Sequence, residues 1–428
     1  MKKILIISPH FPPVNSPDMQ RVRMSLPFYK KFGWEPTVIC VDENYVEGFR
    51  DELLSKTIPE VQVYKVKAFS IGYTRKFGLG SLSIRSFFQF RKIGNFLLKN
   101  EKFDLIFFST TAFHVCRLGP YWKRKFKIPF IVDMQDPWRN DFYLDKPASE
   151  RPPKFRVSYL IDKYLEGATI PYADGIMSVS EGYRLMLMKR YSGLKNEQFE
   201  IIPFAASLND FTIAKQFVKE VSVKLKKEKF NIVYVGRGGH DLAYSLSILF
   251  TAIDEGLKRD NETFKNIHLT FVGTSYAHGN SGRQTIVPVA ARFNLENIVT
   301  ELPGRISYFE TLSLLEKADM LFVPGSTDTA YTASKIYPYV ILKKPLLAIF
   351  HYSSSVINFL ENVLSVKNFI AFDNRNDYKN YADECIEKLH TQILSGFNDL
   401  NMDKLAPYLA EENTHKQAKF FNRVVNSR

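Results

Sequence analysis

At 428 residues, the chain is too long for one ordinary hydrophobic core, so we expect two domains of about 200 residues each. Hydrophobic residues make up 45% of the chain and charged residues 24%, the balance of a soluble globular protein. The net charge of +13 favours an anionic partner: a phosphorylated ligand, an acidic membrane surface or nucleic acid. Nucleic acid is the weakest of these, because no recognised binding module or Arg-rich tail is present.

The cysteines and the N-terminus both indicate a cytoplasmic protein. Cys40, Cys116 and Cys385 are scattered without the spacing of a disulfide framework or a metal site. The opening apolar run, residues 4–7, is far too short for a secretory signal, so we expect a first strand there. No segment approaches the roughly 18 apolar residues of a spanning helix, and any membrane contact is expected to be peripheral, on the inner face.

Short apolar runs alternate with longer amphipathic stretches along the chain. In the first half the runs are residues 4–8, 37–41, 61–66, 105–109, 130–133, 175–179 and 200–203. After a Lys-rich break between residues 207 and 229, they resume at residues 231–236, 268–273, 298–302, 320–324 and 346–349. Near-continuous apolar strands that alternate with helices indicate parallel sheets covered on both faces. We therefore predict an α/β protein with two Rossmann-like, doubly wound domains, residues 1–207 and 229–405.

The tail, residues 414–428, has a helical pattern. Two placements are open for this helix. It packs back on the first domain, or it is an ordinary C-terminal packing helix.

Ligands of parallel sheets bind beyond the carboxyl ends of the strands, so the loops there are the first candidates for a site. The loop at residues 8–21 is stiffened by prolines and opens a helix near Asp18, with Asn15 and Arg21 as candidates to face a cleft. A structural connector is the competing interpretation. His114 lies just past the strand that ends at Ser109, a position that raises the chance of a site role for a usually packed or surface residue.

The densest polar cluster follows the predicted strand at residues 130–133. Asp133, Asp136 and Arg139 lie there beside Trp138, whose ring suits the face of a pyranose. Such a cluster could position a hydroxyl nucleophile or bind a sugar, whereas the competing interpretation is an Asp–Arg pair that fixes a loop. Together with His114, these two aspartates and Arg139 are our candidates for catalysis.

The glycine-rich loop Gly236-Arg237-Gly238-Gly239 lies between a predicted strand and a helix. Glycines let the backbone approach a ligand, the helix N-terminus offers free N–H groups, and Arg237 adds a fork of donors suited to a diphosphate. The alternative is a plain strand-to-helix turn. Asp241 is interpreted as the cap of the helix.

A second loop, residues 323–339, contributes Ser326, Asp328, Ser334 and Lys335. Beside the glycine loop it could hold a base and ribose, with Lys335 near the phosphates. On its own it is an ordinary surface loop with an exposed lysine. The residues of both loops are predicted to bind a donor.

The chain has no HExxH, DxD or CxxC pattern, so we expect neither a metal site nor a bound cofactor. The lack of DxD argues against a donor site built on a chelated metal.

Two stretches, residues 73–102 and 117–127, interleave Lys and Arg with aromatic residues. This combination could dock on an anionic bilayer surface. The alternative is the solvated face of ordinary surface helices.

Several segments occur in the order found in a known family. They are the opening strand with Pro12-Pro13 and residues 133–138, 173–181, 201–204, 234–237, 317–319 and 334–339. The chain resembles GT-B fold glycosyltransferases of the large retaining family 4 group, in the subgroup that acts in surface polysaccharide synthesis. The resemblance covers nearly the whole chain, and the collinear order of the motifs carries it.

This resemblance implies two Rossmann-like domains that face a cleft. It implies transfer of a hexosyl group from a nucleotide-sugar in the C-terminal domain to a saccharide or lipid-linked acceptor held by the N-terminal one. Carried over by position, Arg237 contacts the diphosphate, Gly236 allows its approach, and Lys335 lies near the nucleotide.

The chain also departs from the family pattern. The two family glutamates fall on Ala330 and Pro338, and a family lysine falls on Leu242. Two alternatives therefore stay open beside the transferase. One is a non-catalytic relative that binds a saccharide or a partner enzyme, and the other is a sugar-nucleotide epimerase on the same fold.

Overall fold

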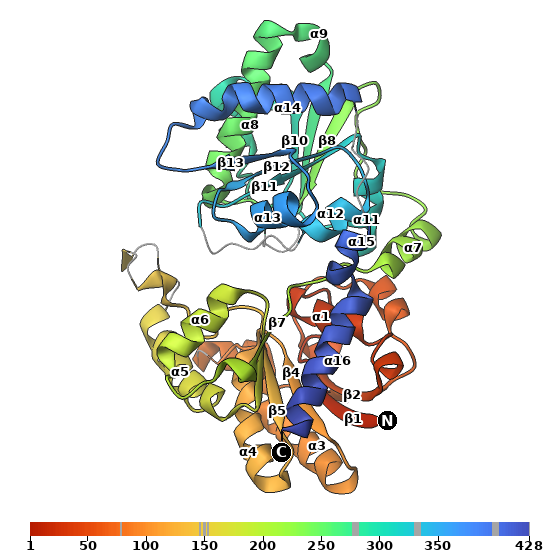
Figure 1. Cartoon of the computed structure of the whole chain (residues 1–428), viewed down its shortest axis with the longest axis vertical. Helices are drawn as coiled ribbons and strands as arrows, with labels where there is room; N and C mark the ends of the chain where they lie inside the picture. Colours follow the sequence, from red (N-terminus) through yellow and green to blue (C-terminus); the bar gives the residue numbers. More distant parts are fainter. Residues whose placement is uncertain are drawn as a thin grey trace. The chain divides into compact units, whose positions relative to one another are not determined.

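A computed structural model describes residues 1–77, 79–144, 147–148, 151, 154–275, 282–328, 335–395 and 402–427. The chain divides into two compact units (Figure 1). The first unit comprises Met1–Ala205 together with Ala410–Arg428, and the second comprises Ala206–Leu409.

The first unit is built on a seven-stranded sheet in the order β3-β2-β1-β4-β5-β6-β7, and every pair of neighbours is parallel. Its strands are β1 (Lys2–Ile7), β2 (Trp34–Val41), β3 (Gln62–Val66), β4 (Leu105–Ser109), β5 (Phe130–Met134), β6 (Gly175–Ser178) and β7 (Phe199–Ile201). Alternate residues of each strand enter opposite cores. In β1, Leu5 and Ile7 join one buried cluster, whereas Ile4 and Ile6 join the other.

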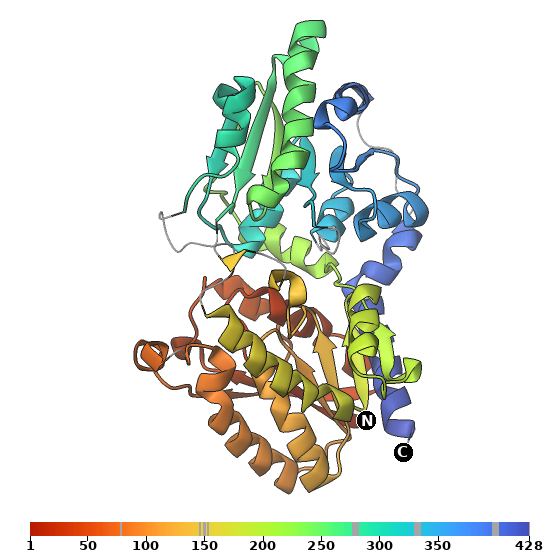
Figure 2. The same cartoon turned by 90° about the vertical axis from the view of Figure 1, so that its left-hand side faces the viewer.

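Helices cover both faces of this sheet (Figure 2). They are α1 (Gln20–Ser25), α2 (Ile71–Thr74), α3 (Leu82–Asn100), α4 (Leu118–Phe126), α5 (Phe155–Gly167), α6 (Glu181–Arg190) and α16 (Ala410–Asn426). Phe90 of α3 and Trp122 of α4 are fully buried on one face. Gly94 lets these two helices approach each other, because a Cβ atom there would overlap the Trp122 ring.

The last helix, α16, lies on the other face, beside α1 (Figure 1). Its Phe420 and Phe421 enter the core together with strands β1 and β4. Tyr29 Oη donates to Gln417 Oε1 at 2.7 Å, and Arg423 pairs with Glu200 at 2.8 Å. The C-terminal helix is therefore part of the first unit, although it follows the second in sequence.

The second unit contains a six-stranded parallel sheet in the order β10-β9-β8-β11-β12-β13. Its strands are β8 (Phe230–Val235), β9 (Ile267–Val272), β10 (Val299–Leu302), β11 (Met320–Pro324), β12 (Leu346–His351) and β13 (Phe369–Phe372). The helices are α7 (Leu208–Phe217), α8 (Ala243–Arg259), α9 (Asn261–Phe264), α10 (Val287–Ala290), α11 (Tyr308–Lys317), α12 (Ile336–Ile341), α13 (Ser355–Asn358), α14 (Ala382–Ser395) and α15 (Met402–Leu405). Helix α8 packs against α14, and α11 packs against α7.

The prediction of two doubly wound parallel-sheet domains is confirmed. Each predicted apolar run coincides with an observed strand. Strand β13 was not predicted, because its four residues form a short edge strand that pairs with β12 alone. The Lys-rich break contains α7, which belongs to the second unit.

The three cysteines are buried and free. Among the helices that the structure describes, none combines the length and apolar character needed to cross a bilayer.

Candidate functional site

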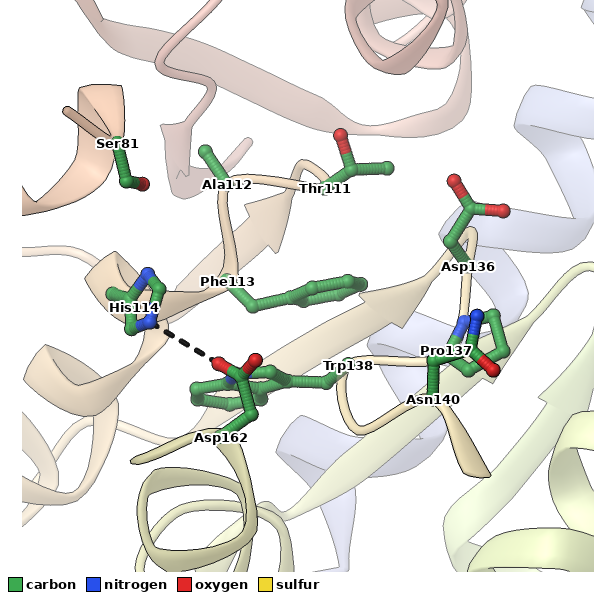
Figure 3. Close-up of a pocket in the computed structure, with 10 residues that line it drawn as sticks. All are labelled: Ser81, Thr111, Ala112, Phe113, His114, Asp136, Pro137, Trp138, Asn140 and Asp162. Atoms are coloured by element: carbon green, nitrogen blue, oxygen red, sulfur yellow. Dashed lines mark hydrogen bonds and ion pairs between the residues drawn. The ribbon is translucent and has the colours of Figure 1, made fainter. Parts of the chain in front are cut away.

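A pocket of about 450 Å³ opens in the first unit, where the loops after β4 and β5 meet helix α5 (Figure 3). It lies beyond the carboxyl ends of neighbouring parallel strands, the position at which such sheets bind ligands. Its lining residues are Ser81, Thr111, Ala112, Phe113, His114, Asp136, Pro137, Trp138, Asn140 and Asp162. Of the predicted acceptor-side residues, His114 and Asp136 therefore meet in one pocket.

An aromatic pair forms one wall of the pocket. The rings of Phe113 and Trp138 stack with centroids 5.5 Å apart and planes 14° apart. Trp138 Nε1 donates to Asp162 Oδ1 at 3.2 Å, and His114 Nε2 lies 3.2 Å from the same oxygen. Two side chains thus fix the Asp162 carboxylate, and Figure 3 shows His114 and Asp136 at opposite ends of the aromatic pair.

Asp136 is the exposed carboxylate of this pocket. Partial burial by the surrounding loops, with the nearby charge of Asp18, raises its pKa to about 6. The carboxylate is therefore ionised at neutral pH and becomes protonated only slightly below it.

Asp18 lies beneath the pocket loops, 2% exposed. Its Oδ2 accepts hydrogen bonds from Thr110 Oγ1 at 2.9 Å and from the Thr111 amide at 3.1 Å, and His10 Nδ1 lies 2.9 Å away. Burial raises the pKa of Asp18, but the His10 charge and these hydrogen bonds outweigh burial and lower the pKa to about 2. Asp18 is thus a permanent negative charge that ties the first loop to the end of β4.

Asp133 and Arg21 lie in the interior rather than in the pocket. The Arg21 Nε atom is 2.8 Å from Asp133 Oδ2, and both side chains are 1% exposed or less. Ser109 Oγ also donates to this carboxylate, while Arg21 Nη2 donates to the Ile202 carbonyl at 2.7 Å. In the structure, Arg21 and Asp133, which were predicted separately as site residues, form a buried pair that joins α1, β5 and the end of β7. Asn15, the other predicted cleft residue of the loop at residues 8–21, accepts a hydrogen bond from Gln20 Nε2 at 3.3 Å.

Arg139 belongs to a network beside the pocket and not to its lining. Its amide donates to Glu166 Oε2 at 3.0 Å, and its Nε lies 3.3 Å from Asp141 Oδ1. Fully buried Glu166 also pairs with Arg190 at 3.0 Å and accepts from Tyr191 Oη at 2.8 Å. This network fixes the loop that carries Trp138 and Asn140, so the action of Arg139 on the pocket is indirect.

In the second unit, the glycine loop follows β8. A Cβ atom at Gly236 would overlap Lys335 Nζ and the Tyr234 ring, so this position requires glycine for the lysine to approach. Gly239 adopts a φ of 143°, and the Gly238 amide donates to the Thr274 carbonyl at 2.8 Å, which ties the loop to the end of β9.

Lys335 precedes α12 and lies against this loop. Its Nζ is 5.4 Å from the centre of the Tyr234 ring. Burial, and then the charges of Arg237 and Arg305, lower its pKa to about 7. Three positive side chains thus converge on the glycine loop. Arg305 was missed from the sequence, although Pro303 and Gly304 before it mark a turn at the end of β10.

Arg237 holds a carboxylate in this structure. Its Nη1 and Nη2 atoms donate to the two oxygens of Asp241 at 2.9 and 2.6 Å. Burial raises the pKa of Asp241, but the hydrogen bonds and charge of Arg237 outweigh it, and the pKa is lowered. The interpretation of Asp241 as a helix cap was wrong, since the side chain binds Arg237 and α8 has no side-chain cap. The fork of donors on Arg237 is therefore occupied by the Asp241 carboxylate in this structure, and another anion would have to take the place of that carboxylate.

The loop after β11 is tied to the glycine loop. The Thr327 amide donates to the Asp241 carbonyl at 3.0 Å, and the Asp328 amide donates to buried Ser326 Oγ at 3.0 Å. Asp328 itself is exposed. Of the remaining predicted positions, Ser334 and Ala330 lie outside the described residues, and Pro338 lies in α12.

Comparison with known proteins identifies the architecture. No family model and no curated protein matches the sequence. Among solved structures, a UDP-forming trehalose-phosphate synthase from Burkholderia xenovorans matches at 12% identity with a TM-score of 0.56, covering 100% of this chain and 98% of that one. The N-terminal domain of trehalose-6-phosphate phosphatase from Candida albicans matches at 15% identity with a TM-score of 0.63, covering 100% and 97%. The chain has the GT-B fold.

A third GT-B structure extends the comparison. TarM from S. aureus, solved as a variant with Fondaparinux, α-GlcNAc-glycerol and UDP, matches at 11% identity with a TM-score of 0.58, covering 99% of this chain and all of that one. At these identities the likeness concerns the fold. In this GT-B chain, each unit carries its candidate residues at the carboxyl ends of its own strands.

Proposed function

We propose that the protein is a glycosyltransferase that moves a hexosyl group from a nucleotide-sugar to a saccharide or lipid-linked acceptor. The observation that carries this proposal is the convergence of Arg237, Arg305 and Lys335 on the glycine loop after β8. Two guanidinium groups and an ammonium group match the charge of a diphosphate. The solved GT-B neighbour with bound UDP supports the same class of donor.

The proposed chemistry is stabilisation of the leaving group. The bond between the anomeric carbon of the sugar and the diphosphate oxygen breaks, and a bond to an acceptor hydroxyl oxygen forms. The hydroxyl proton passes to the departing diphosphate, whose negative charge Arg237, Lys335 and Arg305 stabilise. Since these side chains supply positive charge, we propose that transfer needs no metal ion and no further cofactor. On the acceptor side, Asp136 and His114 would orient the hydroxyl groups of the sugar.

Two finer parts of the proposal rest on the family resemblance. The collinear motifs favour retention of the anomeric configuration and a role in cell-surface polysaccharide synthesis. The anomeric proton coupling of the product, measured by NMR, tests the first part, and an inverted product would contradict it. Loss of surface polysaccharide on deletion of the gene tests the second.

The test of the donor site is a thermal-shift panel of UDP, GDP, ADP, CMP and their common sugar conjugates. We expect one nucleotide series to raise the unfolding temperature of the wild type and to have no such effect on Arg237→Ala. The matched control is Arg292→Ala, because Arg292 is an exposed arginine of the same unit. A shift that survives in Arg237→Ala would reject the donor site.

A second candidate function is a GT-B chain that binds nucleotide without transferring sugar. The observation that favours it is Pro338, which stands in α12 where the family carries a glutamate. Such a protein would be stabilised by a nucleotide but would form no product with any acceptor. An epimerase would instead release an epimerised nucleotide-sugar without an acceptor.

We further propose that the protein acts at the cytoplasmic face of an anionic membrane. Support comes from α5, whose Val157, Leu160, Ile161 and Tyr164 are between 46% and 71% exposed and share one helical face. Beyond its C-terminal end, Arg117, Lys123 and Arg124 line a small basic pocket together with Tyr172. An apolar stripe flanked by cations is suited to an anionic lipid surface.

Of the two stretches predicted for docking, the first is divided by the structure. Phe88 and Phe96 of α3 are 63% and 59% exposed, whereas Phe90 is buried in the core. In the second stretch, Trp122 is buried, and Arg124 and Lys125 are exposed. The first stretch therefore offers aromatic side chains to a membrane, and the second offers cations.

Sedimentation with phosphatidylglycerol vesicles tests this surface. We expect the wild type to sediment with them and the double variant Leu160→Ser, Tyr164→Ser to stay in the supernatant. Leu394→Ser is the control, because Leu394 is equally exposed in the other unit. Equal sedimentation of all three proteins would reject the α5 surface.

A further inference from the structure

The pocket of the first unit is acidic, although the protein as a whole is basic. Among its described lining residues are two carboxylates, Asp136 and Asp162, and no lysine or arginine. The buried Asp18 carboxylate beneath the pocket loops adds a third negative charge. The histidines present are bound to these acids, since His114 lies 3.2 Å from Asp162 and His10 lies 2.9 Å from Asp18.

The arginines nearest to this pocket point their donors elsewhere. Arg85 adjoins Ser81, but its guanidinium donates to the carbonyl oxygens of Gly80, Phe69 and Tyr45 at 3.2, 2.7 and 2.9 Å. Two further arginines near the pocket, Arg139 and Arg190, are bound to carboxylates instead.

Arg139 pairs with Asp141, and Arg190 pairs with both Asp141 and buried Glu166. Arg117, which follows His114 in the chain, lines the separate basic pocket. An anion in the acidic pocket would therefore lie beside Asp136 and Asp162, and His114, the one described lining residue that can carry a positive charge, is already held by Asp162.

We infer that the sugar that enters this pocket carries hydroxyl or amino groups and no phosphate or carboxylate, and that Asp136 and Asp162 enforce this selection. The inference rests on the proposed function, in which the pocket holds the acceptor. Carboxylates accept hydrogen bonds from hydroxyl and ammonium groups alike, and they repel anions. The Phe113–Trp138 pair supplies an apolar wall for the C–H face of a sugar ring.

The two carboxylates differ in how firmly neighbouring side chains hold them. Asp162 is fixed by Trp138 and His114, so it offers an acceptor in a set direction. Asp136 is exposed, stands at the other end of the aromatic pair and adapts to the ligand (Figure 3). Two hydrogen-bond acceptors at opposite ends of the aromatic pair would select a sugar by the hydroxyl or amino groups that it carries at two positions.

An array of immobilised saccharides, probed with the full-length labelled protein, tests this inference. The array carries terminal sugars in four matched forms: neutral, amino, uronic acid and phosphorylated. We expect the wild type to bind neutral or amino termini at least about tenfold better than either anionic form. The neutral and amino arms show which hydrogen-bond donor is preferred.

Two variants test whether these residues make the selection. The first is the single variant Asp136→Asn, and the second is the double variant that combines Asp136→Asn with Asp162→Asn. We expect the preference over anionic termini to fall several-fold in the first and towards one in the second. Glu181→Gln, at an exposed acid of the same unit, is the control and should keep the wild-type preference. Asp136→Asn changes an exposed side chain, so this variant gives an answer even if the double variant folds poorly.

Preferred binding of an anionic terminus by the wild type would overturn the inference, as would an unchanged preference in Asp136→Asn. If a nucleotide stabilises the protein but no terminus of any form binds, the pocket does not hold an acceptor sugar and the inference fails alone. If no nucleotide stabilises the protein either, the proposed function fails first.

Discussion

The two units present opposite charges at the carboxyl ends of their strands. Beyond β4 and β5 of the first sheet lies a pocket with Asp136 and Asp162, whereas beyond β8 of the second sheet lies a loop surrounded by Arg237, Arg305 and Lys335. Both sheets are parallel and doubly wound, so the backbone offers the same geometry twice. The comparison teaches that the fold supplies the position of a site, while the loops supply its chemistry.

The contrast also limits what net charge reveals. With a formal charge of +13, the protein would be expected to attract anions everywhere. The pocket of the first unit is nevertheless acidic, because its neighbouring arginines are bound to carbonyl oxygens and to Glu166 and Asp141. Net charge describes long-range attraction, whereas local partners decide the sign of the potential inside a site.

The largest effect on stability is expected from a comparison of substitutions at two aspartates of the first unit, buried Asp133 and exposed Asp136. Asp133→Ala would leave Arg21 buried without its carboxylate, which costs about 3–5 kcal/mol of stability. Asp136→Asn, at an exposed position, should change the free energy of unfolding by no more than about 0.5 kcal/mol. Urea denaturation of both variants, followed by near-UV circular dichroism, measures the difference. Equal destabilisation would show that the distinction between the buried pair and the pocket is wrong.

The next largest effect concerns the second unit. Replacing Lys335 with Met removes one charge from the proposed diphosphate site, and a hydrogen bond to a charged group contributes about 1.5–3 kcal/mol. We expect the dissociation constant of the stabilising nucleoside diphosphate to rise by about 10- to 100-fold, as measured by calorimetry. Lys343→Met, at another lysine of this unit, should leave it unchanged. A wild-type affinity in Lys335→Met would remove the lysine from the site.

The same lysine predicts a pH dependence. Its pKa is lowered to about 7, so the ammonium form, which attracts a diphosphate, prevails below that pH and is lost above it. Nucleotide affinity should therefore fall several-fold between pH 7 and 9 in the wild type and stay level in Lys335→Met. A fall of the same size in the variant would assign the titration to another group.

The acidic pocket should show the opposite pH dependence. Asp136, with a pKa near 6, carries its charge above that pH and loses it below. Binding of an amino-terminated saccharide should thus weaken a few-fold between pH 7 and 5, and Asp136→Asn should abolish this change. A neutral saccharide serves as the control, since it lacks the charge that the carboxylate attracts.

The smallest effect, none at all, is expected from a chelator. If the cations of the second unit alone stabilise the leaving group, transfer should proceed at the same rate with EDTA present. Recovery of a lost rate by added Mg²⁺ would show instead that a metal ion shares this role.

The sequence predicted the fold well because near-continuous apolar runs ending at turn residues are a strong signal for parallel strands. Loops at strand ends are recognisable for the same reason, so the sequence offered candidate residues in both units, and their roles in binding or catalysis stay predictions. The assignment of single residues was less successful. Asp133 and Asp136 are three positions apart, yet Asp133 ends inside the sheet and Asp136 lies in the loop.

The missed residues share a physical cause. Asp162 lies on α5, and which side of a helix meets a pocket depends on how that helix packs. Arg305 approaches Lys335 because β10 and β8 are both neighbours of β9, a relation that only the strand order reveals. The sequence placed Asp18 at the start of a helix. Its hydrogen bonds to Thr110 and Thr111 could not be predicted, because these residues are far from Asp18 in sequence and meet it only in the folded chain.

The position of α16 has a consequence for how the protein is made. The helix covers one face of the first sheet, yet its residues are translated after the entire second unit. During synthesis, the part of that face of β1 and β4 that α16 covers stays exposed until α16 itself has been translated. The second unit is in effect inserted into the first, so it can complete its fold on the ribosome while the N-terminal sheet still waits for its final helix. A nascent chain that stops short of α16 would thus present an unfinished apolar surface to chaperones and proteases.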